Sequence, residues 1–144
     1  TGTVTLVFTD VKGSTVQWEK DPETMAKAIS IHNKIMRKKL EEYRGYEVKT
    51  EGDAFMVAFS DCINAVKWCL DLQQSLMKED WPEELLKNEE SSIEYDSQKR
   101  MIYRGLRVRM GANKGNPSAE PDPVTGRMDY FGQMVNQSAR VEGI

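Results

Sequence analysis

Residues 45–59 read GYEVKTEGDAFMVAF, two strand-like runs joined by a short turn. The turn holds Gly52 and Asp53, residue types that tolerate the positive φ angles of a tight hairpin. An acid therefore stands at the tip of the predicted hairpin, and a lone cation, Lys49, stands on the strand before it. Simple alternation places Lys49 on the face opposite Tyr46, Val48 and Thr50. This hairpin decides the fold, because its flanking segments must supply the remaining strands and the covering helices.

Those flanking segments alternate between strand and helix patterns. Residues 4–9 (VTLVFT) are short, apolar and β-branched, which predicts a buried strand. Asp21 followed by proline predicts the start of a long amphipathic helix, and Ser60 or Asp61 caps a second one. Residues 106–111 (LRVRMG) alternate as a strand. The order β-α-β-β-α-β predicts an α+β domain of the ferredoxin-like (βαββαβ) type, an antiparallel sheet with two helices on one face.

Other segments give weaker signals. Residues 79–104 are polar and acidic without a clear period, so we expect an inserted loop or extension. Prolines and glycines predict a loop over residues 112–128, and residues 132–140 look helical. The second helix has a predicted inward face made of Cys62, Val66, Cys69, Leu70, Gln73, Leu76 and Met77.

Composition bounds the class of protein. The chain has 144 residues and 30% charged side chains, which predicts one domain over residues 1–144. A net charge of −3 argues against a nucleic-acid partner, since such proteins are usually basic. No apolar run approaches the roughly 18 residues of a membrane span. Cys62 and Cys69 are too far apart along one helix for a disulfide, which favours a reducing compartment. The missing initial Met suggests a piece cut from a longer chain.

Two acids carry the chemical hypothesis. Asp10 closes the first strand, and the exposed amides of the turn that follows favour phosphate. Alternatively, Asp10 or Ser14 simply caps a short helix, and Asp53 is a turn residue. Taken together, the end of the first strand and the tip of the hairpin meet at one edge of a ferredoxin-like sheet. Converging carboxylates there suit a two-metal site for phosphoryl chemistry, with Mg²⁺ or Mn²⁺.

The remaining polar candidates have simpler explanations when taken alone. Lys49 could be a solvated lysine at a sheet edge. Arg107 and Arg109 alternate with apolar residues, so they point away from the packed face. His32 lies on an apolar helical face and is interpreted as a partly buried core residue. A catalytic triad has no support, because His32 has no suitable partner.

Four stretches in order resemble the catalytic domain of class III nucleotidyl cyclases, closest to adenylate cyclases of the fungal and protozoan type. They are VFTDVKGST, YEVKTEGDAFMVAF, LRVRMG and MDYFGQMVNQSARVEG, and the resemblance covers nearly the whole chain. It implies a palm-type domain that converts ATP to 3′,5′-cyclic AMP and pyrophosphate for intracellular signalling. It also implies a homodimer with active sites at the subunit interface.

The resemblance assigns roles residue by residue. Asp10 and Asp53 match the metal aspartates, and Val11 the residue that lends a backbone carbonyl. Two Mg²⁺ ions per site are implied, for which Mn²⁺ can substitute. The other matched positions are Lys49 and Asp129 for the base, Asn136 and Arg140 for the ribose and the reacting phosphate, and Arg109 near the interface as a further substrate-binding arginine.

Adenine fits the pair Lys49 and Asp129. A carboxylate accepts a hydrogen bond from N6 and an ammonium group donates to N1, whereas guanine reverses that edge. A buried mismatch of this kind discriminates by a factor of about 10⁴. In guanylate cyclases of the family, Glu occupies the position that matches Lys49.

The sequence departs from the family pattern in two places. The usual Gly-x-His-x-Gly reads GANKG, with Asn113 at or beside the histidine position, and a later phosphate lysine is not in this sequence.

We weigh as alternatives an inactive cyclase-like nucleotide-binding module, a guanylate cyclase and a ferredoxin-like RNA binder. The expected location is a cytoplasmic domain of a larger, membrane-associated protein, whose regulator the sequence does not name.

Overall fold

The computed structural model describes residues 3–115, 118–121 and 128–131. Its elements are β1 (Val4–Val11), α1 (Ser14–Lys20), α2 (Pro22–Glu42), β2 (Tyr46–Glu51), β3 (Ala54–Phe59), α3 (Cys62–Lys78), α4 (Glu83–Leu86), the 3₁₀ helix η1 (Glu89–Ser91), β4 (Glu94–Tyr95), β5 (Met101–Tyr103), β6 (Val108–Gly115), β7 (Ser118–Pro121) and β8 (Met128–Phe131).

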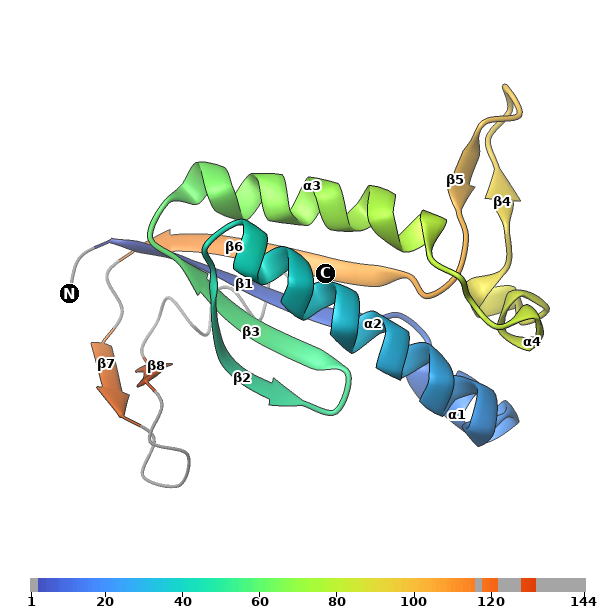
Figure 1. Cartoon of the computed structure of the whole chain (residues 1–144), viewed down its shortest axis with the longest axis horizontal. Helices are drawn as coiled ribbons and strands as arrows, with labels where there is room; N and C mark the ends of the chain where they lie inside the picture. The colour runs from blue at the N-terminus through green and yellow to red at the C-terminus, as the bar shows by residue number, and fades with distance from the viewer. Residues whose placement is uncertain (1–2, 116–117, 122–127, 132–144) are drawn as a thin grey trace.

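Four strands form an antiparallel sheet in the order β2-β3-β1-β6, so β1 lies centrally between β3 and β6. Helices α2 and α3 run across one face of this sheet (Figure 1). The predicted α+β, ferredoxin-like βαββαβ arrangement is therefore confirmed. Asp21 caps α2, since its side chain accepts a hydrogen bond from the Thr24 amide at 3.2 Å, and Pro22 follows at the first helical position as predicted.

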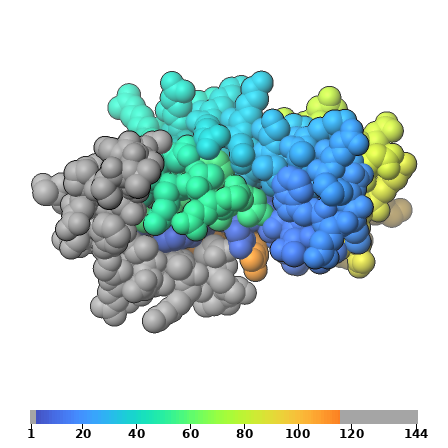
Figure 2. All heavy atoms as spheres, turned by 90° about the horizontal axis from the view of Figure 1, so that it is seen from below, coloured from blue at the N-terminus to red at the C-terminus, as the bar shows by residue number. Residues whose placement is uncertain are grey.

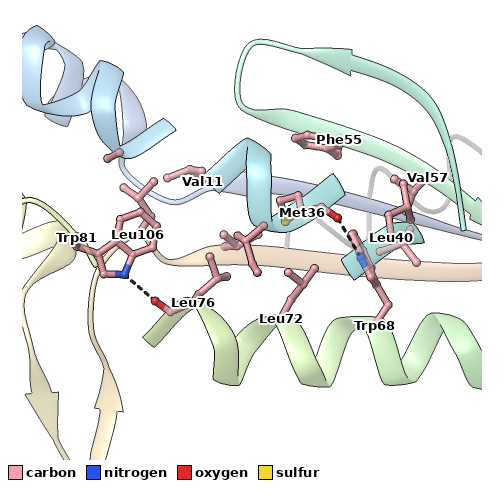
Figure 3. Close-up of a cluster of buried hydrophobic side chains, with 14 of the residues drawn as sticks. Val11, Met36, Leu40, Phe55, Val57, Trp68, Leu72, Leu76, Trp81 and Leu106 are labelled. Atoms are coloured by element: carbon pink, nitrogen blue, oxygen red, sulfur yellow. Dashed lines mark hydrogen bonds between the residues drawn. The ribbon is translucent and has the colours of Figure 1, made fainter. Parts of the chain in front are cut away.

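The main core lies between the helices and the sheet. Strand residues such as Val7, Val57 and Phe59 meet α2 and α3 there, and all are essentially inaccessible to solvent. Trp68 on α3 fills the centre, and its indole Nε1 donates to the Met36 carbonyl at 3.4 Å (Figure 3). An aromatic ring of this size releases more apolar surface from water than any neighbour, so it fixes how α3 sits on the sheet.

The predicted inward face of α3 is wrong in part. Val66 is 57% exposed and Leu70 is 63% exposed, although both were assigned to the core face. The buried residues of α3 are Ala65, Trp68, Leu72 and Leu76. The apolar residues of α3 would allow more than one face of the helix to be buried. The face that is buried is the one that carries the large Trp68 side chain.

Lys49 lies on the same face as Tyr46 and Val48 and not opposite them as predicted, although it does lie opposite Thr50, which pairs with the core residue Phe55. The register between β2 and β3 shifts between Glu47 and Lys49, which is a β-bulge. The bulge inserts one extra residue, Val48, so Lys49 pairs with Met56. Met56 and Val48 both belong to a second apolar cluster, on the sheet face opposite the helices. Lys49 therefore shares the face of Val48, because the bulge breaks simple alternation.

The segment 79–104 is an extension with its own helices and strands, as one of the two predicted alternatives had it. It forms α4, η1 and the β4–β5 hairpin, which projects from the body of the molecule beyond the end of α3 (Figure 1). Its base is anchored by Trp81, whose indole Nε1 donates to the Leu76 carbonyl at 2.6 Å (Figure 3). Ser91 is fully buried and donates a hydrogen bond to Gln17. We call β4, β5 and their connection the insert hairpin.

Strand β6 is longer than predicted. It continues through Gly115, and residues 112–115 pair with the start of β1, so these residues are strand and not the predicted loop. β7 also lies in the stretch that was predicted to be a loop, and it pairs with β8, which begins at its end. The predicted helix over residues 132–140 lies outside the described residues. None of the helices in the described part of the chain is long and apolar enough to cross a membrane.

Gly105 provides a test of how the insert is anchored. Its φ is +88°, and an added Cβ would lie 2.0 Å from Trp81 Nε1. Gly105→Ala should lower the free energy of unfolding by about 2–5 kcal/mol, the sum of backbone strain and overpacking. Gly52→Ala is the matched control, because Gly52 also has a positive φ (+59°) but a Cβ there meets open space. Equal losses in urea denaturation of the two variants would contradict the tight packing against Trp81.

Candidate active site

Asp10 and Asp53 lie at the same end of the sheet. Thr9 on β1 pairs with Phe55 on β3, which places Asp10 next to the start of β3. Asp53 lies in the turn immediately before that start. Figure 2 shows the β2–β3 hairpin in green adjoining the blue segment that contains the end of β1 and α1. The predicted shared edge of the first strand and the hairpin tip is therefore present in the fold.

Asp10 is not a helix cap. Helix α1 has Gly13 at its N-cap with no side-chain cap hydrogen bond, so the capping alternative for Asp10 and Ser14 is wrong. Asp10 belongs to β1, directly opposite Arg109 on β6. The two side chains form a bidentate ion pair, with Arg109 Nε donating to Asp10 Oδ1 at 2.8 Å and Nη2 donating to Oδ2 at 2.6 Å. Such fork-to-fork pairs are among the stronger charge-assisted contacts.

Asp53 differs from Asp10 in its hydrogen bonding. Its Oδ2 atom is buried and finds no hydrogen-bond partner among the described residues. The same is true of Thr9 Oγ1 and His32 Nε2. A buried carboxylate oxygen without a donor is costly, so it marks a position where a cation or a donor group would be stabilising.

His32 is a core residue, as predicted, and is completely buried. Its ring packs edge-on against Phe55, with centroids 5.7 Å apart, and Nδ1 lies 2.8 Å from Asn33 Oδ1. Burial lowers the pKa of His32, and it outweighs the hydrogen bond with Asn33 and the charge of Asp53, which both raise it. Burial therefore disfavours the charged form of the ring.

Lys49 lines a cavity of about 120 Å³ on the sheet face opposite the helices. Phe8 and Met56, which pair across β1 and β3, also line this cavity, together with Glu51, Ala54 and Phe55. An apolar floor with a cation at its edge suits a flat, polar-edged group such as a purine. Sequence reasoning missed Phe8 and Met56. Their signal was their position two residues before Asp10 and three after Asp53.

Asp129 lies on β8, and Cα atoms of β8 approach those of β2 within 8 Å. The backbone therefore brings the strand of Asp129 beside the strand of Lys49. Asn136 and Arg140 lie outside the described residues, and Val11 is the buried last residue of β1.

A group of cations lies next to Asp10. Arg107 and Arg109 on either side of Val108 point away from the core, as predicted, while Val108 is buried. Lys12, which sequence reasoning did not single out, lines the same cavity as both arginines. The sequence feature that could have pointed to Lys12 is a basic residue in the turn directly after the acid that ends the strand.

The donor set fits a hard divalent cation. Asp10 and Asp53 supply the carboxylate oxygens that Mg²⁺ prefers, and Asp53 Oδ2 lacks another partner in the described part of the chain. The described residues contain no group of three or more His, Cys, Asp or Glu side chains that could enclose a metal. The acids therefore fit an ion that keeps several oxygen ligands from another source, which is the usual arrangement for Mg²⁺ with phosphates.

Comparison with known proteins agrees with this geometry. The family model described as the adenylate and guanylate cyclase catalytic domain matches residues 1–144. An adenylate cyclase of Neurospora crassa is 51% identical over 100% of this chain, and one of Schizosaccharomyces pombe is 46% identical over 99%. The chain spans only 6% and 8% of the length of these two relatives.

A solved adenylate cyclase structure from Trypanosoma brucei, in its monomeric state, superimposes with a TM-score of 0.86. It is 33% identical, with 99% of this chain and 68% of that chain covered. The match of the family model to every residue, together with these relatives, is far more specific than any single motif. This chain belongs to the family of adenylate and guanylate cyclase catalytic domains.

Proposed function

We propose that this chain is an adenylate cyclase catalytic domain that converts ATP to 3′,5′-cyclic AMP and pyrophosphate. The observation that carries the proposal is the shared edge of β1 and β3, which holds Asp10 and the partly unsatisfied Asp53, with a group of cations next to Asp10. Carboxylates that can bind metal ions therefore lie near basic side chains that can bind phosphate. The names of the similar fungal proteins support ATP as the substrate.

In the proposed reaction the ribose 3′-oxygen attacks the α-phosphorus and pyrophosphate leaves in line. Two Mg²⁺ ions, or Mn²⁺ in their place, would supply a lowered pKa for the 3′-hydroxyl and positive charge beside the triphosphate. Asp10, Asp53 and the Val11 carbonyl would hold these ions. Asn136 and Arg140 would orient the ribose and donate to the phosphate as negative charge builds there. The proton would pass to water or to a substrate oxygen.

Lys49 and Asp129 would select adenine. The bulge in β2 turns Lys49 toward the cavity floored by Phe8 and Met56, where the ammonium group would donate to N1 of the base. Asp129 would accept from N6, and the neighbouring positions of β2 and β8 support this pairing. The guanylate cyclase alternative is disfavoured, because guanine would present N1–H to a cation that can only donate.

We further propose a homodimer with two composite sites. In this arrangement Asp10, Asp53 and Arg109 of one protomer would act with Lys49, Asp129, Asn136 and Arg140 of its partner. Two-fold symmetry then makes two equivalent sites. The domain would work in the cytoplasm, within a larger, membrane-associated protein.

The metal assignment can be tested by charge removal. Asp10→Asn and Asp53→Asn should each reduce cyclic AMP formation by about 100-fold or more, because each deletes a ligand charge at the reacting phosphate. Circular dichroism should show an intact fold, and Mn²⁺ binding followed by electron paramagnetic resonance should weaken. Asp61→Asn is the matched control, since asparagine can still cap α3. Near-normal turnover in either site variant would remove the two-metal assignment.

The base assignment predicts a shift in nucleotide choice. Lys49→Glu combined with Asp129→Cys should weaken the use of ATP and admit GTP, because the new groups match the edge of guanine. The measurement is kcat/KM for each nucleotide, with Lys67→Glu as a control for a general charge change at an exposed position of α3. An unchanged ratio of ATP to GTP use would mean that these residues do not select the base.

Shared sites predict complementation between inactive variants. Asp10→Asn and Arg140→Ala homodimers each carry two broken sites. A mixed dimer carries one site with both defects and one with neither, so activity should reappear on mixing, toward about half the wild-type value in each mixed dimer. The variants should be co-purified on two different affinity tags to verify mixed dimers. If verified mixed dimers stay inactive beside an active wild-type dimer, the shared-site mechanism is wrong.

A further inference from the structure

The insert hairpin forms one wall of a cavity of about 480 Å³ at the start of β6. The opposite wall is the turn that follows Asp10. The lining residues are Lys12, Gln73, Glu94, Tyr103, Arg107, Val108 and Arg109. Three of these carry a positive charge and one a negative charge, so the cavity favours an anion.

The two arginines of this cavity are held by acids. Arg109 is paired with Asp10, as described above, and Arg107 Nη2 lies 2.7 Å from Glu94 Oε1 on the insert hairpin. Glu94 is itself 49% exposed, whereas the Arg107 side chain is only 9% exposed. Lys12 makes no ion pair with the residues that the structure describes, and its side chain is exposed. An incoming anion could therefore pair with Lys12 directly and compete with Glu94 and Asp10 for the arginines.

The cavity is built on rigid supports. The guanidinium group of Arg107 stacks over the Tyr103 ring at 4.7 Å, so it is already oriented before any ligand arrives. The Lys12 amide donates to the Arg107 carbonyl at 2.8 Å, which ties the turn after β1 to the residue before β6. On the other side of the strand, Gln73 Nε2 donates to the Val108 carbonyl at 2.8 Å. Preorganised donors lose little entropy when they bind an anion.

The charges of this cavity indicate what kind of anion it would hold. Three cations around one cavity suit a ligand with several negative oxygens better than a single carboxylate. The cavity also adjoins Asp10, so an extended anion in it would point toward the proposed metal position. A divalent ion at Asp10 would release Arg109 from its present partner, and the freed guanidinium would then face the same anion.

We infer that this cavity is a polyphosphate subsite, in which Lys12 and Arg107 act with Arg109 and the insert hairpin supplies the wall. The inference rests on the proposed function, and it gives the insert a role in binding. Glu94 is a resting counter-ion that the anion must displace. The ligand is either the β,γ end of the nucleotide or the free pyrophosphate product, which share the same chemistry.

Binding of inorganic pyrophosphate to the metal-free chain, measured by isothermal titration calorimetry with chelator present and at low ionic strength, tests the inference. Lys12→Met should weaken pyrophosphate binding about tenfold, the size expected for one charge-assisted contact. Glu94→Gln should strengthen it by about three- to fivefold, because it removes the competing charge while keeping the side-chain volume. Lys67→Met is the matched control, as Lys67 is an exposed lysine on α3 outside the cavity.

Steady-state kinetics then separate the two sources of the anion. If the nucleotide tail occupies the subsite, Lys12→Met should raise KM for ATP several-fold with little change in kcat. If the product occupies it, Lys12→Met should raise the inhibition constant of pyrophosphate and leave KM for ATP unchanged. Both constants rise if the subsite serves both ligands.

The inference is overturned if Lys12→Met and Lys67→Met weaken pyrophosphate binding equally, or if Glu94→Gln leaves it unchanged or weaker. Because the calorimetric test requires no turnover, it is independent of the proposed activity. A chain that binds pyrophosphate through Lys12 but forms no cyclic AMP would contradict the proposed function and leave the subsite in place.

Discussion

The register of the central strand β1 is the constraint on which the rest of the molecule depends. β1 pairs with both β3 and β6, so a single alignment places Phe8 opposite Met56 and Asp10 opposite Arg109. A slip of one residue would carry Asp10 to the helix side and Thr9 to the other, since side chains alternate between faces. Val7 and Val57, buried together in the main core, oppose such a slip. Core packing thereby fixes the positions of charged groups that the core does not touch.

The acids and cations of the site balance one another without any ligand. Asp10 is neutralised by Arg109 and Arg107 by Glu94, so the protein does not need to hold a dense group of like charges apart. Asp53 differs, because one of its oxygens is buried without a donor in the described residues. Because of this difference, a bound cation is stabilised most by Asp53, whereas at Asp10 it must first displace Arg109.

Much of this arrangement could be predicted from the sequence because its signals are local. The Asp21-Pro22 helix start, the Gly52-Asp53 turn and the apolar run of β1 each depend on a few adjacent residues. The bulge at Val48 could not be predicted, because it depends on how β2 fits β3, and neither could the buried stripe of α3, which depends on where Trp68 finds space. The elements of the insert could not be predicted, because its anchors, Trp81 and Ser91, are single buried residues in a polar sequence without a period.

The bulge in β2 has a consequence for changes in chain length. Val48 is the extra residue, and Lys49 pairs with Met56 just as it would in a regular ladder without Val48. Deletion of Val48 would thus shorten the strand and remove one buried apolar side chain. Lys49 would still lie on the same face of the sheet. Loss of any one codon from Thr50 to Gly52 would instead pull the hairpin tip out of phase with β3. Evolution can therefore vary the length of β2 on one side of Lys49 but not on the other.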